Sequence, residues 1–313
     1  MVRRLIQRGL TGIVTLLLVS ALVFVLIQWA PGSPVSDVDD GFYPMTAEER
    51  ATLEAMWRLD QPLHQQYLAW VGDLLRGDLG DSIRDRRPVS TKIAERLPLT
   101  LMLNLMSLVV ILLIAVPVGA AAALHPGSRF DRWSAISTYG LYAVPVFWAA
   151  LLLQRLFAVE LGWLPLAGRG GNGWSALTHL ILPVVCLSYG GLAYVSRFVR
   201  TQLLESTPPE AVRSARARGM TPLRVLYRHG FRLAAVPMLT LAGFLIPSLI
   251  AGSVIVESVF QLPGLGRLFL DAAYHRDLPV LLGMTLLSGC ASLLGILLAD
   301  VAYALFDPRV RRG

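Results

Sequence analysis

Six apolar runs, each long enough to cross a lipid bilayer, constrain this sequence more than any other feature. A helix needs about 20 apolar residues to cross about 30 Å of hydrocarbon, because it rises about 1.5 Å per residue. Helices satisfy their own backbone hydrogen bonds in lipid, and these runs lack the alternation of barrel strands. The sequence therefore predicts an all-α, polytopic membrane protein with six transmembrane helices. They cover about residues 10–30, 99–124, 134–159, 178–200, 234–256 and 280–305.

The composition agrees with a membrane protein and argues against several enzyme classes. The chain is 55% hydrophobic and 16% charged, whereas soluble domains average about 25% charged residues. Its only lysine, Lys92, follows Thr91 rather than glycine, so the chain has no Walker A phosphate-binding loop. The sequence also has no HExxH, CxxC or GxSxG motif. We expect a protein that is not an enzyme and binds neither a cofactor nor a metal.

The distribution of arginine predicts the orientation of the six helices. Most arginines lie in the N-terminal tail, in the 125–133 loop, in the 197–232 region and in the C-terminal tail. Cytoplasmic loops of membrane proteins carry such an excess. The net charge of +7 therefore indicates membrane topology rather than nucleic-acid binding. Both termini are predicted to be cytoplasmic, as an even number of spans requires.

The first apolar run is predicted to be a retained helix, not a signal peptide. It is longer than an ordinary signal-peptide core, and the residue at the −3 place before Pro31 is Gln28 rather than a small residue. The 31–98 segment that follows is predicted to be a small helical extracytoplasmic structure. Thr46 and Glu49 have the spacing of a capping box, and a second amphipathic stretch ends at Gly77.

Prolines within the apolar runs predict bends, because each removes a backbone hydrogen bond. The prolines are Pro117, Pro145, Pro183, Pro237 and Pro247.

Ionisable residues are few within the apolar runs, and such residues are often functional. Arg155 either snorkels to water, pairs with Glu160 or faces a polar pathway, and Asp300 lies near a predicted helix end.

The charged loop 207–230 has the start and stop signals of two short helices. Thr207 caps the first, and Gly219 suits the left-handed backbone that ends it. Thr221 and Pro222 begin the second, and Gly230 is expected to close it.

Two functions fit such an ordered basic loop, namely contact with anionic lipid and docking into a groove of a soluble partner. Alanines at 211, 215 and 217 make the first helix slim, and alanine and glycine offer lipids little contact. Docking into a partner is therefore favoured.

The order of several motifs resembles the membrane permease subunits of ATP-binding-cassette importers, in the branch for dipeptides, oligopeptides, nickel and related solutes. The loop "ARARGMTPLRVLYRH" resembles the family's EAA-type coupling loop, and Glu257 lies in a second matching stretch. Together the motifs cover nearly the whole chain. They are "APGSPV", "LDQPLHQQYLAWVGDLLRGDLGDSI", "RRPVSTKIAERLPLTLML", "LGWLPLAG", the coupling loop, "GSVIVESVFQLPGLGRL" and "DPRVR".

The resemblance implies a type I importer permease fold whose coupling helix seats in a cytoplasmic ATPase. The sequence departs from the general EAA pattern, since Arg213 stands where glutamate is expected when the motif is aligned on Gly219. Arg155 and Glu257 are the candidates for lining the translocation pathway. The candidate coupling residues are Glu210, Ala211, Arg213, Ala215, Arg216, Ala217, Arg218 and Gly219.

The resemblance further implies a multi-pass protein of the bacterial inner membrane that forms half of a pathway for peptides or similar solutes. Its expected partners are a second homologous permease subunit, two ATPase subunits that bind ATP and Mg, and an extracytoplasmic binding protein. Nickel, opines, glutathione and oligosaccharides are alternative solutes, and a secondary transporter or channel is an alternative class. The expected domains are 1–30, 31–98, a core at 99–306 with coupling loop 201–232, and a tail at 307–313.

Overall fold

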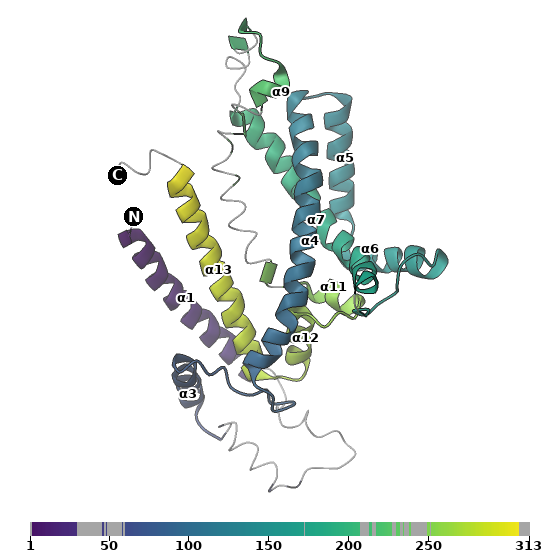
Figure 1. The fold of residues 1–313 in the computed structure, drawn as a ribbon. Coiled ribbons are helices and arrows are strands. Elements are labelled where there is room, and N and C mark those ends of the chain that lie inside the picture. The colour runs from purple at the N-terminus through teal and green to yellow at the C-terminus, as the bar shows by residue number, and fades with distance from the viewer. Residues whose placement is uncertain are drawn as a thin grey trace. The chain divides into compact units, whose positions relative to one another are not determined.

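Within the residues that the computed structural model describes, all regular structure is helical apart from one bridge between Asp81 and Pro88. It describes residues 2–29, 46, 48, 58, 60–171, 173–206, 213–214, 217–226, 230–231, 234, 238, 249–250 and 252–306, without the side chains of 2–6, 299–300 and 302–306. The helices are α1 (Val2–Trp29), α3 (Leu63–Leu75), α4 (Val89–Leu124), α5 (Arg129–Ala143), α6 (Val146–Leu153), η1 (Gln154–Glu160), α7 (Trp174–Ser206), α9 (Pro222–Val225), α11 (Val254–Val259), α12 (Leu265–Tyr274) and α13 (Leu278–Phe306) (Figure 1).

Four helices within the described residues are long and apolar enough to cross a membrane by themselves. They are α1, α4, α7 and α13, and they contain the predicted spans at 99–124, 178–200 and 280–305 and all but the last residue of 10–30. The bent pair of α5 with α6 and η1 is a fifth candidate. Pro117 and Pro183 lie inside α4 and α7 respectively.

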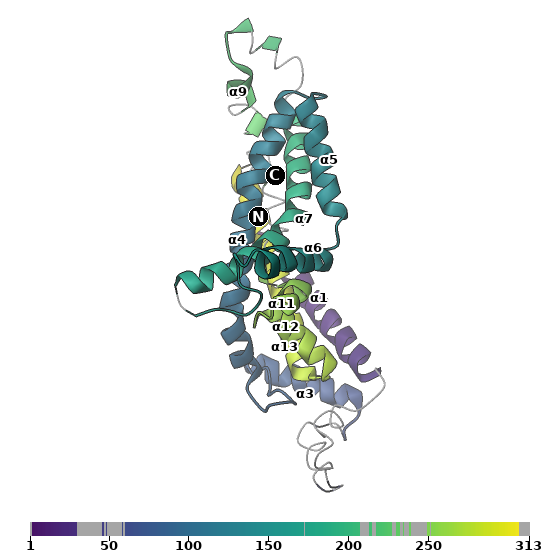
Figure 2. The same ribbon diagram turned by 90° about the vertical axis from the view of Figure 1, so that its right-hand side faces the viewer.

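The predicted span over 134–159 is broken at Pro145, one of the prolines at which the sequence predicts a bend, and the helix ends before this residue. Val144 has extended backbone, and the axis turns by 93° between α5 and the α6–η1 segment (Figure 2). Proline lacks an amide hydrogen and disfavours helical backbone in the residue before it. The Tyr189 hydroxyl of α7 donates to the Val144 carbonyl at 2.7 Å, which satisfies an acceptor at the break.

Most of the predicted fifth span, 234–256, lies outside the described residues. Its predicted end is wrong, since the chain leaves helical backbone at Gly252 and α11 begins at Val254. Gly252 has φ of +70°, a left-handed conformation that interrupts a helix and is open to glycine at little cost. The predicted amphipathic helix at 45–60, which contains the Thr46–Glu49 capping box, also lies largely outside the described residues. The second predicted amphipathic helix, which ends before Gly77, is confirmed by α3.

The chain divides into two compact units. Unit 1 comprises 1–100 and 263–293, and unit 2 comprises 101–262 and 294–313. In unit 1, α3 packs on α1 through Tyr67, whose ring contacts Phe24 edge-on at 5.6 Å between centroids. The Tyr67 hydroxyl lies 2.9 Å from Ser20 Oγ and donates to the Leu17 carbonyl. An amphipathic helix is thus joined to a membrane helix by both apolar and polar contacts.

Helices α1 and α13 approach each other closely at two glycines (Figure 1). A Cβ added to Gly12 would clash with a methyl of Leu293, and one added to Gly289 would clash with a methyl of Leu16. Each leucine therefore fills a notch where the other helix has no side chain. Small residues allow membrane helices to pack in this way.

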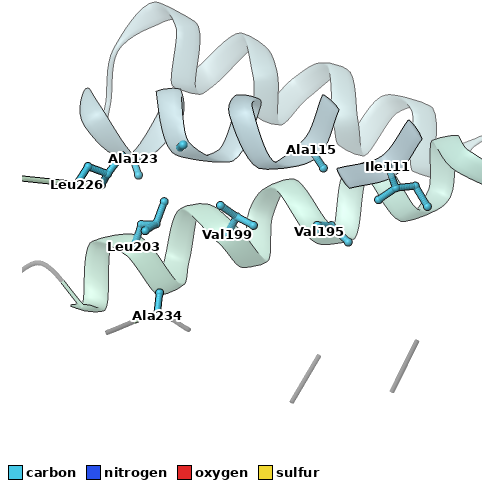
Figure 3. Packing of buried hydrophobic residues seen from close by; sticks show 9 residues of the cluster. Ile111, Ala115, Ala123, Val195, Val199, Leu203, Leu226 and Ala234 are labelled. Carbon is cyan, nitrogen blue, oxygen red and sulfur yellow. The ribbon is translucent and has the colours of Figure 1, made fainter. Parts of the chain in front are cut away.

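The core of unit 2 lies where α4 and α7 run side by side (Figure 3). Gly119 of α4 faces the backbone of Ser196 and the side chain of Val199, so no larger residue fits there. Further along, Ile111 fills the space beside Gly191. The buried cluster contains Ile111, Ala115, Ala120, Ala123, Val195, Val199, Leu203, Leu226 and Ala234.

Candidate functional site

Half of the candidate coupling residues lie within the described structure. Arg213, Ala217, Arg218 and Gly219 are exposed, and the backbone of Arg213 and Ala217 is helical. Glu210, Ala211, Ala215 and Arg216 lie outside the described residues. The described part is therefore a solvent-facing surface with two arginines.

Gly219 has φ of +78°, the left-handed conformation expected at the end of a helix. A Cβ added there would meet nothing within 4 Å. The position therefore selects glycine for its backbone and not for lack of space. The prediction for this residue's conformation is confirmed.

The second helix of the loop begins as the sequence predicts. Thr221 Oγ1 accepts a hydrogen bond from the Arg224 amide at 3.4 Å, and Pro222 occupies the first turn of α9. The expectation that Gly230 closes this segment is wrong, because Gly230 and Phe231 are themselves helical. Phe231 packs against the unit 2 core, so burial favours continued helix over a stop at this glycine.

The loop is joined to the membrane helices by apolar burial. Val225 is buried, and Leu226 and Ala234 belong to the cluster between the ends of α4 and α7 (Figure 3). In Figure 3, Leu226 and Ala123 of α4 lie close together. The described end of the loop is therefore anchored in the core that contains residues of α4 and α7.

A buried carboxylate, Asp131, lies at the start of α5 and binds two arginines of α7. Arg200 Nε donates to Asp131 Oδ1 at 2.6 Å and Arg200 Nη2 donates to Oδ2 at 2.7 Å, a bidentate pair. Arg197 Nη1 lies 3.5 Å from Oδ1, and its Nη2 donates to Ser134 Oγ at 2.7 Å. We call these four residues the Asp131 cluster; together they tie α5 to α7.

Sequence reasoning used these arginines for topology and missed the cluster. A signal was present, because Ser128 and Asp131 have the spacing of a helix start. Ser128 Oγ accepts from the Asp131 amide at 3.2 Å, and the Gly127 amide donates to Asp131 Oδ2 at 2.9 Å. An acid held in that way, on a side rich in arginine, marks a pairing site.

Two amides tie separate segments of unit 2 together. Asn104 of α4 donates to the Leu249 carbonyl at 2.9 Å, close to the helix break at Gly252. Gln154 donates to the carbonyls of Leu166 at 2.8 Å and Val259 at 3.3 Å. Leu166 in "LGWLPLAG" and Val259 in "GSVIVESVFQLPGLGRL" are thus held near each other, and both stretches carry the family resemblance.

The two candidate pathway residues lie in different environments. Arg155 in η1 is 76% exposed and donates to Glu160 Oε1 at 2.8 Å, which is one of the three expected alternatives. Glu257 in α11 is 2% exposed. Their role in a pathway stays a prediction. The side chain of Asp300 lies outside the described residues.

A second buried ionic cluster surrounds Lys92 in unit 1. Its ammonium donates to Ser82 Oγ at 2.8 Å and to Asp85 Oδ1 at 3.0 Å, and lies 3.9 Å from Asp277 Oδ2. Ser82 Oγ donates to Asp277 Oδ2, and the Ile83 amide donates to Oδ1 at 3.1 Å. These residues, the Lys92 cluster, fasten the 81–88 loop to the start of α13.

The electrostatics of the Lys92 cluster favour ionised Asp85. Burial alone would raise the pKa of this carboxyl. Hydrogen bonds from Lys92, Ser82 and the Arg87 amide together lower it by more than burial raises it, so the pKa of Asp85 lies below the ordinary value. Among the described residues, no group of three His, Cys, Asp or Glu side chains could hold a metal ion.

Comparison with known families and proteins finds matches along nearly the whole chain. The family described as "Binding-protein-dependent transport system inner membrane component" matches residues 115–312, and its N-terminal domain matches 1–104. The chain is 38% identical to the oligopeptide transport system permease protein AppB of Bacillus subtilis, with 98% of each chain covered. It is 36% identical to the di/tripeptide transport system permease protein DppB of Pseudomonas aeruginosa, with 94% of each covered.

The fold is also similar to a solved structure. The match is a chain of the MetNI methionine ABC transporter in an inward-facing conformation, with a TM-score of 0.54 and 19% sequence identity. It covers 69% of this chain and 96% of that one. The likeness shows a shared permease fold and is too distant in sequence to indicate a solute.

Proposed function

The chain belongs to the family of binding-protein-dependent transport system inner membrane components, and on that premise we propose that it carries peptides across the membrane. Membership makes it a membrane-spanning permease subunit of an ATP-driven importer, a transport component rather than an enzyme. It is a multi-pass protein of the inner membrane and works in a complex with ATPases and a binding protein.

The family membership leaves no support for a secondary transporter or channel. Support for peptide as the solute comes from relatives at 36% and 38% identity that are named as oligopeptide and di/tripeptide permeases. Nickel, opines, glutathione and short oligosaccharides are the alternatives to be tested by uptake.

We further propose that residues 210–219 form the coupling helix and seat in a cleft of a cytoplasmic ATPase subunit. The exposure of Arg213, Ala217 and Arg218 supports this, because a docking surface must face solvent. Leu226 supports it as well, since burial against α4 and α7 gives the segment a firm connection to the bundle. Both termini then lie in the cytoplasm, with the 31–98 segment on the opposite side.

The proposed mechanism is a population shift between two packings of the helices. Two ATPase subunits, which bind ATP and Mg, close and displace the coupling helices of this chain and of a second, homologous permease subunit. In this chain Leu226 carries the displacement to α4 and α7. The Asp131 cluster makes α5 follow α7, because a bidentate arginine pair resists separation.

The observation that carries this proposal is the exposure of Arg213 and of 217–219, followed by the burial of Leu226 further along the loop. The test is Gly219→Glu in the assembled importer, read out as co-purification of the ATPase subunits and as peptide uptake. A side chain at φ of +78° is strained by about 1–2 kcal/mol, and a glutamate there also adds a charge to the docking surface.

Two controls separate docking from backbone strain. Gly219→Asn tolerates the left-handed backbone and adds no charge, so it should retain the ATPases. Gly77→Glu adds the same side chain at a φ of +83°, also with no atoms within 4 Å, but far from the loop in sequence. Normal ATPase binding and uptake by Gly219→Glu would refute the coupling proposal.

A further inference from the structure

A groove between α5 and α7 lies beside the Asp131 cluster, and half of its lining residues are aromatic. The two helices run side by side (Figures 1 and 2), and the groove between them has a volume of about 410 Å³. The rings of Tyr194 and Phe198 stack with their centroids 6.2 Å apart. The lining residues of this α5–α7 groove are Tyr139, Tyr142, Ala193, Tyr194, Arg197, Phe198, Thr201 and Gln202.

One side of the groove is cationic and contains a hydrogen-bond donor, Arg197 Nε, that has no acceptor among the described residues. Asp131 is one carboxylate shared by Arg197 and Arg200, so the cluster itself keeps one net positive charge. The Nε of Arg197 is buried and finds no acceptor within the part of the chain that the structure describes. A buried donor of this kind needs an acceptor, and a negatively charged oxygen is the strongest one available.

The surroundings of the groove have the character of a lipid-facing surface. Every third residue along α5 is a large apolar or aromatic residue that is exposed, and α5 has no charged residue after Arg132. Tyrosine and tryptophan are typical of the membrane–water interface. The stripe runs into the groove, because its last two members also line it; it consists of Phe130, Trp133, Ile136, Tyr139 and Tyr142.

We propose that the α5–α7 groove binds an anionic phospholipid. The acyl chain lies against Tyr139, Tyr194 and Phe198, and a phosphate oxygen accepts the hydrogen bond from Arg197 Nε. Basic pockets between membrane helices bind anionic headgroups in this way. A peptide fits the groove less well, because its backbone amides need polar partners and the lining is largely apolar.

The test uses the purified full-length chain in detergent, with the thermal unfolding midpoint measured against added lipid. Phosphatidylglycerol should raise the midpoint at a lower concentration than phosphatidylcholine does. Arg197→Gln should require about tenfold more phosphatidylglycerol for the same rise, as expected for losing one charge-assisted hydrogen bond. Arg76→Gln is the matched control, since it removes the same charge from a side chain that is 83% exposed and follows α3.

A second variant keeps the proposal testable if Arg197→Gln fails to fold. Tyr194→Ala leaves the arginines intact and removes an aromatic wall, so it should weaken binding of phosphatidylglycerol. Equal effects of the two lipids, or an unchanged response in both variants, would overturn the proposal. Protection by soluble glycerol 3-phosphate at the same concentration would assign the site to free phosphate, and displacement of lipid by a tripeptide would assign it to the transported solute.

Discussion

The Asp131 cluster and the Lys92 cluster each neutralise a buried carboxylate, the first with arginine and the second with lysine. Both hold a buried carboxylate, Asp131 in unit 2 and Asp277 in unit 1, and both join segments far apart in sequence. Asp131 meets the planar fork of Arg200, which donates two parallel hydrogen bonds. Asp277 is served by Lys92 and by Ser82.

The difference follows from the directions in which the acceptors lie. Around Lys92 they belong to a hydroxyl and two separate carboxylates, and a compact ammonium with three rotatable donors can serve all of them. A flat guanidinium matches one carboxylate edge better than it matches three separate acceptors. The contrast gives a physical reason for the one lysine in a chain whose other basic side chains are arginines.

The largest effect is expected when the acid of the Asp131 cluster is removed. Asp131→Ala leaves Arg197 and Arg200 partly buried without their counter-charge, and breaking a buried pair costs about 3–5 kcal/mol. Chemical unfolding in detergent micelles should show this loss. A change below about 1 kcal/mol, the range of surface ion pairs, would mean that the cluster does not hold α5 to α7.

Reciprocal exchanges of the two cations test the geometric explanation itself. Arg200→Lys should cost about 1.5 kcal/mol or more, because one of two charge-assisted hydrogen bonds is lost. Lys92→Arg should cost about 1–3 kcal/mol, because a larger head group must enter a site that is 6% exposed. Both are measured by the same unfolding experiment. If either exchange is neutral, the choice of cation at that cluster is not dictated by its acceptors.

The smallest effect concerns pH and distinguishes the Lys92 cluster further. The lowered pKa of Asp85 means that its contribution to stability is present above the pKa of the unfolded chain, about 3.9, and is lost as pH falls through the lower folded value. Unfolding midpoints between about pH 2 and 6 should therefore fall less steeply in Asp85→Asn than in the unchanged protein. Parallel curves would show that Asp85 has no part in the acid sensitivity.

The sequence predicts the membrane helices well because length and hydropathy are local properties. The four long helices contain almost all of their predicted runs, and the amphipathic pattern before Gly77 is α3. Pro145 also predicts a break, but its angle depends on contacts such as that of Tyr189 with Val144. Those contacts cannot be read from one segment.

The two clusters mark the limit of sequence reasoning. Ser82 and Asp277 are 195 residues apart, and no local pattern connects them. Asp131 offered a local signal at the helix start, although its partners in α7 did not. The loop at 213–226 shows the opposite case, since Gly219, Thr221 and Pro222 determine their own backbone within a few residues.

The paired notches of α1 and α13 set an order of events during biosynthesis. Gly12 receives Leu293, and Gly289 receives Leu16, so neither helix can complete this contact alone. The ribosome makes α1 hundreds of residues before α13, and contacts between such distant segments form late. The contact between α1 and α13 therefore cannot form until α13 has been synthesised.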